Sequence, residues 1–266
     1  GIFYEHGHRM MATFVGFITL MQAVLLGFSD QPKWIIKLGY ISLILVITQG
    51  ILGGITVLYF LPPVISIIHG ILAQTFFLFT ILIAYGLSSE RTNREDSGYT
   101  KSLRKISFII ISMVYIQLIL GALTRHTASG LAIPDFPTMG GLWIPTFSES
   151  MINNINVMLF DLNLDMIERY QVIIHFSHRL GAFIITFTIG YFFVRYKNII
   201  KEYHHIYKTF IFFSVILLIQ LSLGILTVLS ERSPYIASFH VLTGATLLGL
   251  SFLFVLRTYP TKFGDW

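Results

Sequence analysis

The chain has no cysteine and very few charged residues. Without cysteine among its 266 residues, it forms no disulfide bond and offers no thiolate ligand to a metal ion. Charged residues make up 12% of the chain and hydrophobic residues 55%, and the mean hydropathy is +0.74. In a soluble globular protein about 25% of the residues are charged. The composition therefore excludes a soluble domain and predicts an integral membrane protein.

Long hydrophobic runs take up most of the chain. A bilayer core is crossed by about 20 apolar residues in an α-helix, and seven runs of about that length occur. They cover residues 8–28, 35–59, 64–87, 106–123, 174–194, 208–229 and 236–256. The predicted fold class is an all-α integral membrane protein, built as a bundle of transmembrane helices.

Basic residues gather in alternate loops. Those that follow the third or the fifth run are Arg91, Arg94, Lys101, Arg104, Lys105, Arg195, Lys197, Lys201 and Lys208. The long segment 124–169 holds only Arg125 and Arg169. Because basic loops stay in the cytoplasm, segment 124–169 is expected on the external side of the membrane. The membrane itself is expected to be a bacterial plasma membrane. The net charge of +5 then reflects topology, and nucleic acid is not expected as a partner.

The sequence contains an internal repeat. "QGILGGITVL" (49–58) matches "QLSLGILTVL" (220–229) at six of ten positions, and the same offset of 171 residues carries His69 onto His240. A third copy, "QLILGALT", begins at Gln117. Small residues on one helix face let helices approach closely in lipid, and we expect the glutamines to form hydrogen bonds between helices.

Four histidines follow the same repeat. His8, His69, His178 and His240 each lie within the first two turns of a run, and the two pairs are separated by 61 and 62 residues. Two pseudo-symmetric four-helix bundles are therefore predicted, with the first helix missing from this chain. We expect an N-terminal half-bundle over 1–90, a cytoplasmic linker over 91–105 and a C-terminal bundle over 106–266.

Histidines at matching depth in an apolar bundle are typical of heme ligation. Intramembrane ionisable residues are functional candidates by default, and two imidazoles from facing helices can bind one heme iron from both sides. Zinc or copper is disfavoured, because the pattern offers no thiolate and few clustered carboxylates. The expected iron ligands are His8, His69, His178 and His240.

The residues beside these histidines suggest two different sites. Arg9 and Arg179 directly follow a histidine, where a forked guanidinium suits a heme propionate. Glu5 lies three residues before His8, whereas His175 holds the matching place before His178. A carboxylate near a heme edge can move protons or stabilise positive charge. We therefore expect a working site in the first half and an auxiliary site in the second.

These motifs resemble those of the heme A synthase family, whose members oxidise a methyl group of heme O to the formyl group of heme A. The resemblance covers essentially the whole chain and rests on "EHGHR", "HFSHR", the spaced His69 and His240, and "GALTRHTASGLAIPDFPTMGG" (121–141). The cysteine pair that some members carry is absent.

The resemblance implies a role for each half. His8 and His69 would flank the substrate heme O, later heme A, with Glu5 as the catalytic carboxylate. His178 and His240 would hold a heme b that conducts electrons. The implied reaction is successive hydroxylation of one methyl group, followed by dehydration. Besides the lipid bilayer and heme O, the partners implied are a heme O synthase and an electron donor or acceptor.

Two other functions fit parts of the pattern. A di-heme b-type electron-transfer protein needs the same four histidines but no substrate carboxylate, so Glu5 favours the enzyme. A transporter built from repeats usually has inverted halves and a site near the membrane midplane, which this pattern lacks.

The external segment 124–169 has its own features. Gly130, Pro134 and Pro137 favour turns, and Asp135 is expected to form a turn rather than to take part in catalysis. The apolar spacing of "NNINVMLFDLNLDMIER" predicts a helix. We expect this helix to act as a lid over a heme edge, with a place among the lipid headgroups as the alternative.

Overall fold

The structure is a computed structural model, which describes residues 2–92 and 101–259 and the side chains from His6 onward. Its elements are α1 (Ile2–Gly27), α2 (Lys33–Leu58), α3 (Pro63–Gly86), α4 (Ser89–Thr92), α5 (Lys101–His126), the 3-10 turn η1 (Ser129–Leu131), α6 (Glu149–Asp161), α7 (Arg169–Lys201), α8 (His204–Leu229) and α9 (Pro234–Thr258). Among the described residues there is no β-strand, only one isolated bridge, between Met139 and Leu142. The all-α prediction is confirmed.

Within the described residues, seven helices are long and apolar enough to cross a membrane, namely α1, α2, α3, α5, α7, α8 and α9. Each coincides with one predicted run, so the seven predicted spans are confirmed. Helix α7 has 33 residues and is longer than its run because polar residues continue the helix at both ends. At its start, Glu168 and Gln171 form a capping box, in which each side chain bonds the other's backbone amide.

The described helices fall into two compact units, α1–α4 and α5–α9. In the first unit α2 packs against both α1 and α3. One end of this unit is closed by Leu26, Ile35 and Ile83, with Trp34 and Leu38 packed around them. The predicted linker 91–105 lies partly outside the described residues, and its last five residues form the start of α5. The predicted domain boundaries remain a prediction.

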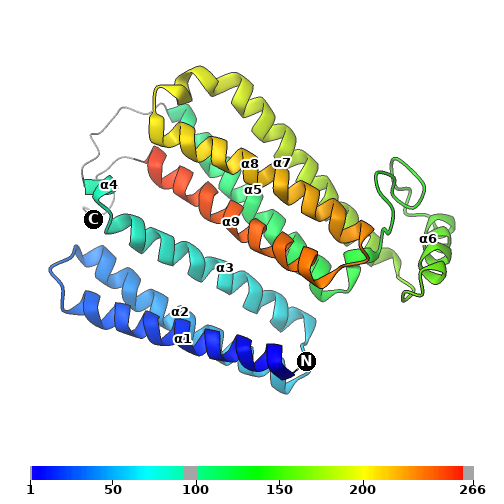
Figure 1. Cartoon of the computed structure of the whole chain (residues 1–266), viewed down its shortest axis with the longest axis horizontal. Coiled ribbons are helices and arrows are strands. Elements are labelled where there is room, and N and C mark those ends of the chain that lie inside the picture. The colour runs from blue at the N-terminus through cyan, green and yellow to red at the C-terminus, as the bar shows by residue number, and fades with distance from the viewer. Residues whose placement is uncertain (1, 93–100, 260–266) are drawn as a thin grey trace. The chain divides into compact units, whose positions relative to one another are not determined.

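The second unit is a four-helix bundle (Figure 1). Its long helices form a closed ring in which α5 packs against α7 and α9, and α8 packs against the same two helices. Helices α7 and α9 are therefore diagonal neighbours across the bundle centre. A flat cofactor in a bundle of this kind is held by side chains from facing helices. A ligand site is therefore expected between the diagonal helices α7 and α9.

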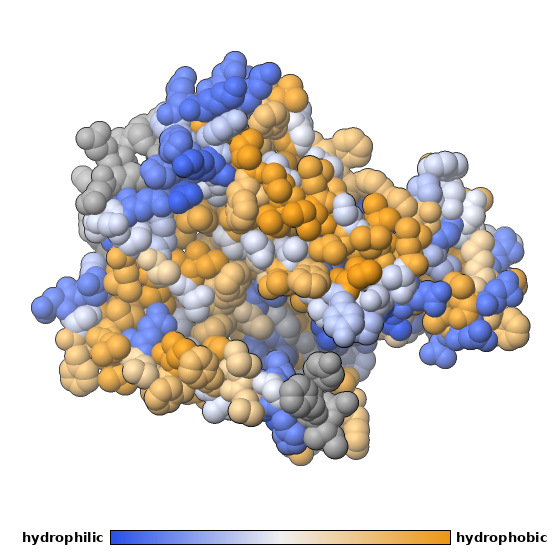
Figure 2. Space-filling view, in the orientation of Figure 1, coloured by the Kyte–Doolittle hydropathy of each residue, from blue (hydrophilic) through white to orange (hydrophobic). Residues whose placement is uncertain are grey.

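The residues between α5 and α7 form a folded lobe at one end of this bundle, here called the loop end. Met151, Ile155 and Leu159 recur every four residues along α6 and pack on Ala132 and Ile133. This face of α6 is buried. The predicted helix over 153–169 is confirmed as far as Asp161, whereas residues 162–168 are not helical. Its opposite face exposes Val157 and Phe160. Figure 2 shows hydrophobic residues over the middle of the second unit and hydrophilic residues gathered at its two ends, as in a membrane protein.

Candidate functional site

Two imidazoles face each other across the diagonal of the second unit. His178 on α7 and His240 on α9 have ring centroids 6.4 Å apart and ring planes at 80°. An imidazole nitrogen binds a transition metal at about 2 Å, so two rings on opposite sides of one metal ion have centroids roughly 6 Å apart. The structure thus places His178 and His240 at a separation that suits one shared iron atom.

Each of these histidines is supported by the repeated Gln-x-x-Leu-Gly motif of a neighbouring helix. The Gln117 side chain on α5 donates to the His178 backbone carbonyl at 2.8 Å, and its amide nitrogen lies 3.1 Å from His178 Nδ1. On α8, the amide nitrogen of Gln220 lies 3.4 Å from His240 Nε2, and the Thr243 hydroxyl donates to the Gln220 carbonyl. The expected interhelical role of the glutamines is confirmed.

The glycines of the same motif make room for the imidazole rings. A Cβ atom at Gly121 would lie 3.2 Å from His178 Cε1, and one at Gly224 would lie 3.1 Å from His240 Cε1. Both distances are shorter than an ordinary carbon–carbon contact. Any larger residue would therefore push the imidazole out of place. Close helix approach was expected from these glycines, but their specific role beside the histidine rings was not.

The histidine nitrogens that do not face a glutamine are available to a ligand. His240 Nδ1 is buried and has no hydrogen-bond partner in the structure, and a buried polar atom without a partner costs free energy. The residues present therefore fit an iron porphyrin, whose iron would be bound by the opposite nitrogens.

The first unit repeats half of this arrangement. The Gln49 side chain on α2 donates to the His69 backbone carbonyl at 2.8 Å, and a Cβ at Gly53 would lie 3.4 Å from His69 Cε1. His69 Nδ1 is also buried without a hydrogen-bond partner. His8 on α1 is exposed. Its pairing with His69 stays a prediction.

The two arginines have different surroundings. Arg179 donates to three backbone carbonyls of the α5–α6 segment, at Ile133 (2.7 Å), Asp135 (3.0 Å) and Thr138 (3.4 Å). A guanidinium has five N–H groups. Its Nε–H points at His175 Nε2 at 3.3 Å, so one N–H group is left, and no carboxylate of the described residues forms an ion pair with Arg179. Arg9 is exposed on α1. The Glu5 side chain lies outside the described residues.

A loop is fixed to the first turns of α7 beside His178. Gln171 donates to the Thr127 carbonyl at 2.9 Å, and the Ile133 amide donates to His175 Nδ1 at 3.2 Å. Arg179 Nε lies 3.3 Å from His175 Nε2, but a neutral imidazole accepts at only one nitrogen. We assign the shorter contact, to Ile133, as the hydrogen bond. His175 is therefore used to hold the loop, which the sequence did not indicate.

Asp135 organises the turn in this loop. Its carboxylate accepts hydrogen bonds from the Thr138 hydroxyl at 2.6 Å and from the Gly140 and Gly141 amides at 2.7 and 2.9 Å. Burial by itself would raise the pKa of the Asp135 carboxyl, but these hydrogen bonds outweigh burial and lower the pKa below its usual value. The expectation that Asp135 forms a turn is confirmed.

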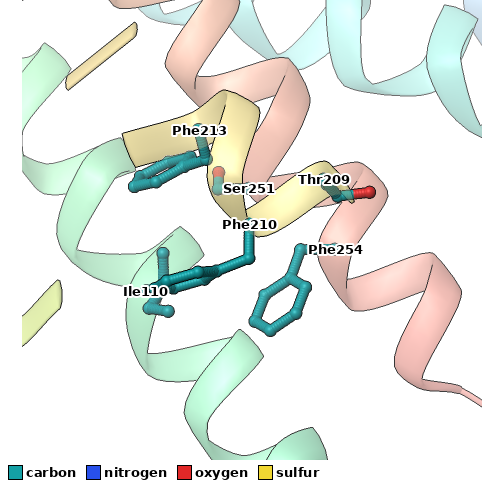
Figure 3. Close-up of a pocket in the computed structure, with 6 residues that line it drawn as sticks. All are labelled: Ile110, Thr209, Phe210, Phe213, Ser251 and Phe254. Atoms are coloured by element: carbon teal, nitrogen blue, oxygen red, sulfur yellow. The ribbon is translucent and has the colours of Figure 1, made fainter. Parts of the chain in front are cut away.

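Three other histidines are exposed at the surface. His204 and His205 are exposed at the start of α8, and His6 is exposed on α1. A small cavity in the second unit lies elsewhere, among phenylalanines of α8 and α9 and Ile110 of α5 (Figure 3). Its volume of about 10 Å³ admits about one water molecule. This cavity is a packing gap rather than a cofactor site.

Similarity to known proteins identifies the family of this chain. Residues 2–252 match the model of the COX15-CtaA family, described as cytochrome oxidase assembly protein. A heme A synthase of Pelagibacter ubique is 27% identical over 270 residues, covering 96% of this chain and 73% of that protein. Heme A synthases of Rickettsia bellii (30% identical; 92% of this chain, 72% of theirs) and Lysinibacillus sphaericus (26% identical; 99% and 81%) are also similar.

Proposed function

This chain belongs to the COX15-CtaA family of cytochrome oxidase assembly proteins, and from that membership we propose that it is a membrane oxidoreductase that makes heme A. Its substrate is heme O, and its product carries a formyl group where heme O has a methyl group. Two successive hydroxylations convert this carbon to an alcohol and then to a geminal diol, each adding the oxygen of one water molecule and releasing two protons and two electrons, the electrons passing to the electron acceptor that the reaction requires. The diol then loses water to give the aldehyde. The observation that carries the proposal is the facing pair His178 and His240.

In this proposal the second unit holds a resident heme b, bound by His178 and His240. When bound, heme b supplies one-electron transfer. The protein's own part is to fix the two imidazoles. Gln117 and Gln220, which contact His178 and His240, would hold these rings in place for the iron. Arg179 has one unused N–H group and forms no ion pair with a carboxylate of the described residues, so it suits a heme propionate.

The first unit is proposed to bind the substrate heme between His8 and His69. His69 has the same glutamine and glycine beside it as His240, together with an unpartnered nitrogen. Arg9 corresponds to Arg179 by its place after the histidine and would bind a propionate. Glu5 would stand beside the reacting methyl group and accept its protons. Both heme sites are proposed to face the outside of the bacterial plasma membrane.

The proposal is tested by purifying the protein from cells that also make heme O. Extracted hemes are separated by chromatography, and hemes B, O and A together are expected. A preparation that contains heme B alone, and that forms no heme A when heme O is supplied, would contradict the synthase and favour an electron-transfer protein. A heme O synthase is the proposed source of the substrate, because heme O is poorly soluble outside a membrane.

A further inference from the structure

We propose that residues 127–138 form a latch that closes the loop end of the second unit over His178 and His240, so that the heme held there does not exchange. This inference rests on the proposed function, because it concerns the heme b of the second unit. It assigns positioning roles to Gln171 and His175, neither of which is expected to bind iron.

The first observation is a ladder of side chains on one face of α7. Gln171, His175 and Arg179 are four residues apart, so they lie above one another along the helix. All three bond the backbone of the same short segment. Gln171 donates to the Thr127 carbonyl, His175 accepts from the Ile133 amide, and Arg179 donates to the carbonyls of Ile133, Asp135 and Thr138. Gln171 and His175 are buried. The loop is therefore fixed to α7 at successive points rather than resting on it.

The second observation is that the latch reaches other helices of the bundle. It begins directly after α5, and η1 packs against both α5 and α7. On the other side, a Cβ at Gly130 would lie 3.2 Å from Arg232 Cδ, in the turn between α8 and α9. The segment thus spans the bundle end. His240 is six residues from Pro234, the start of α9, or about 9 Å below that end at 1.5 Å per residue.

The third observation is that the first unit does not repeat the ladder. The offset of 170 residues that aligns His178 with His8 places Gly1, Glu5 and Arg9 at the three ladder positions. Only the arginine is shared. A substrate site must release its product, whereas a resident cofactor must stay bound. In this proposal His175 keeps the site of the second unit closed around its heme, whereas Glu5 stands at the matching position of the first unit, whose site exchanges substrate for product.

The latch is tested with two substitutions that keep side-chain size. Gln171→Glu retains the oxygen that accepts the Glu168 amide but can no longer donate to Thr127. His175→Phe retains an aromatic ring but removes the acceptor for the Ile133 amide. His175→Gln, which restores an acceptor, should rescue the second change. Ser177→Ala is the control, because this exposed hydroxyl bonds only the Ile173 carbonyl of its own helix.

Two measurements follow in the full-length, heme-loaded protein. The first is the rate of heme transfer to excess apomyoglobin, which should rise about tenfold or more in the double variant, since two buried hydrogen bonds are lost. The second is the reaction of a single cysteine, Ala132→Cys, with a water-soluble maleimide. Ala132 is fully buried, and the chain has no other cysteine, so labelling should also accelerate only when the latch opens.

The outcomes separate the latch from the proposed function. Faster labelling with a heme transfer rate within twofold of the wild type would overturn the latch, because the loop would be open and the heme still retained. Unchanged labelling would overturn it as well, because these bonds would not hold the loop. Absence of a low-spin heme that depends on His178 and His240 would instead contradict the proposed function itself.

Discussion

His69, His178 and His240 share one local arrangement although they lie on three different helices. In each case a glycine of a neighbouring helix admits the edge of the imidazole ring, and a glutamine four residues earlier approaches the same histidine. A side chain that orients a metal-binding histidine also fixes which nitrogen faces the metal. The glutamines should therefore contribute almost as much to heme binding as the histidines that they orient.

Replacing Gln117 by leucine should weaken heme b binding about 10- to 100-fold, the usual effect of removing a residue that orients a ligand. The affinity is measured by titrating heme into the heme-free protein and following the low-spin absorption band. Ser222→Ala on α8 is the control, because its exposed hydroxyl bonds only the Leu218 carbonyl. Equal affinity in the Gln117 variant and the wild type would show that Gln117 plays no part in heme binding.

Replacing Glu5 by glutamine should lower the conversion of heme O about 100-fold or more, the typical contribution of a positioned acid or base. The bound heme content should stay the same, because neither iron ligand changes. The readout is the ratio of heme A to heme O after extraction, together with the total heme per protein. Conversion within twofold of the wild type would remove Glu5 from the mechanism.

The lowered pKa of Asp135 predicts how the loop responds to acid. A carboxyl whose pKa is lower in the folded state stabilises that state fully above the ordinary value of 3.8, and this contribution disappears as the pH falls through the lowered pKa. Trp143 fluorescence, with the other two tryptophans changed to phenylalanine, should report loop opening below that pH. In Asp135→Asn this acid transition should be absent, and its persistence would mean that another group controls it.

At the scale of the helices, the ring formed by α5, α7, α8 and α9 explains why a heme can sit at the centre. The diagonal helices α7 and α9 supply the histidines, while α5 and α8 supply the supporting glutamines and glycines. Each histidine helix is thus backed by one support helix. In the first unit, α2 backs α3 in the same way.

Adjacent glycines on α2 offer a matched test of this support. A Cβ at Gly53 would contact the His69 ring at 3.4 Å, whereas a Cβ at Gly54 would have no neighbour within 4 Å. Gly53→Leu should therefore displace His69 and abolish binding of heme O in the first unit. Gly54→Leu should leave binding unchanged, and both are compared by heme O content after extraction. Similar losses in the two variants would point to general helix damage instead.

At the scale of the whole molecule, the two units are separately packed, so their heme sites should fail independently. His178→Ala should remove the low-spin heme B signal and leave heme O bound, whereas His69→Ala should do the reverse. Reduced-minus-oxidised spectra and heme extraction measure both. Loss of both hemes in either variant would mean that the sites are not independent.

The sequence alone predicted the membrane class, all seven spans and the turn at Asp135. These features depend on long apolar runs and on turn-forming residues that act over a few positions. Each can be recognised locally, because hydrophobic length and short-range hydrogen bonding do not depend on the rest of the fold.

Only the tertiary structure decided which helices stand opposite each other and what the remaining polar side chains contact. It placed Gly121 and Gly224 beside the histidine rings, and it bound His175 to Ile133, 42 residues away. These contacts join segments whose distance along the chain carries no information about their distance in space. Helix packing brings them together, and so it determines that His175 holds a loop at the position where the first unit has Glu5.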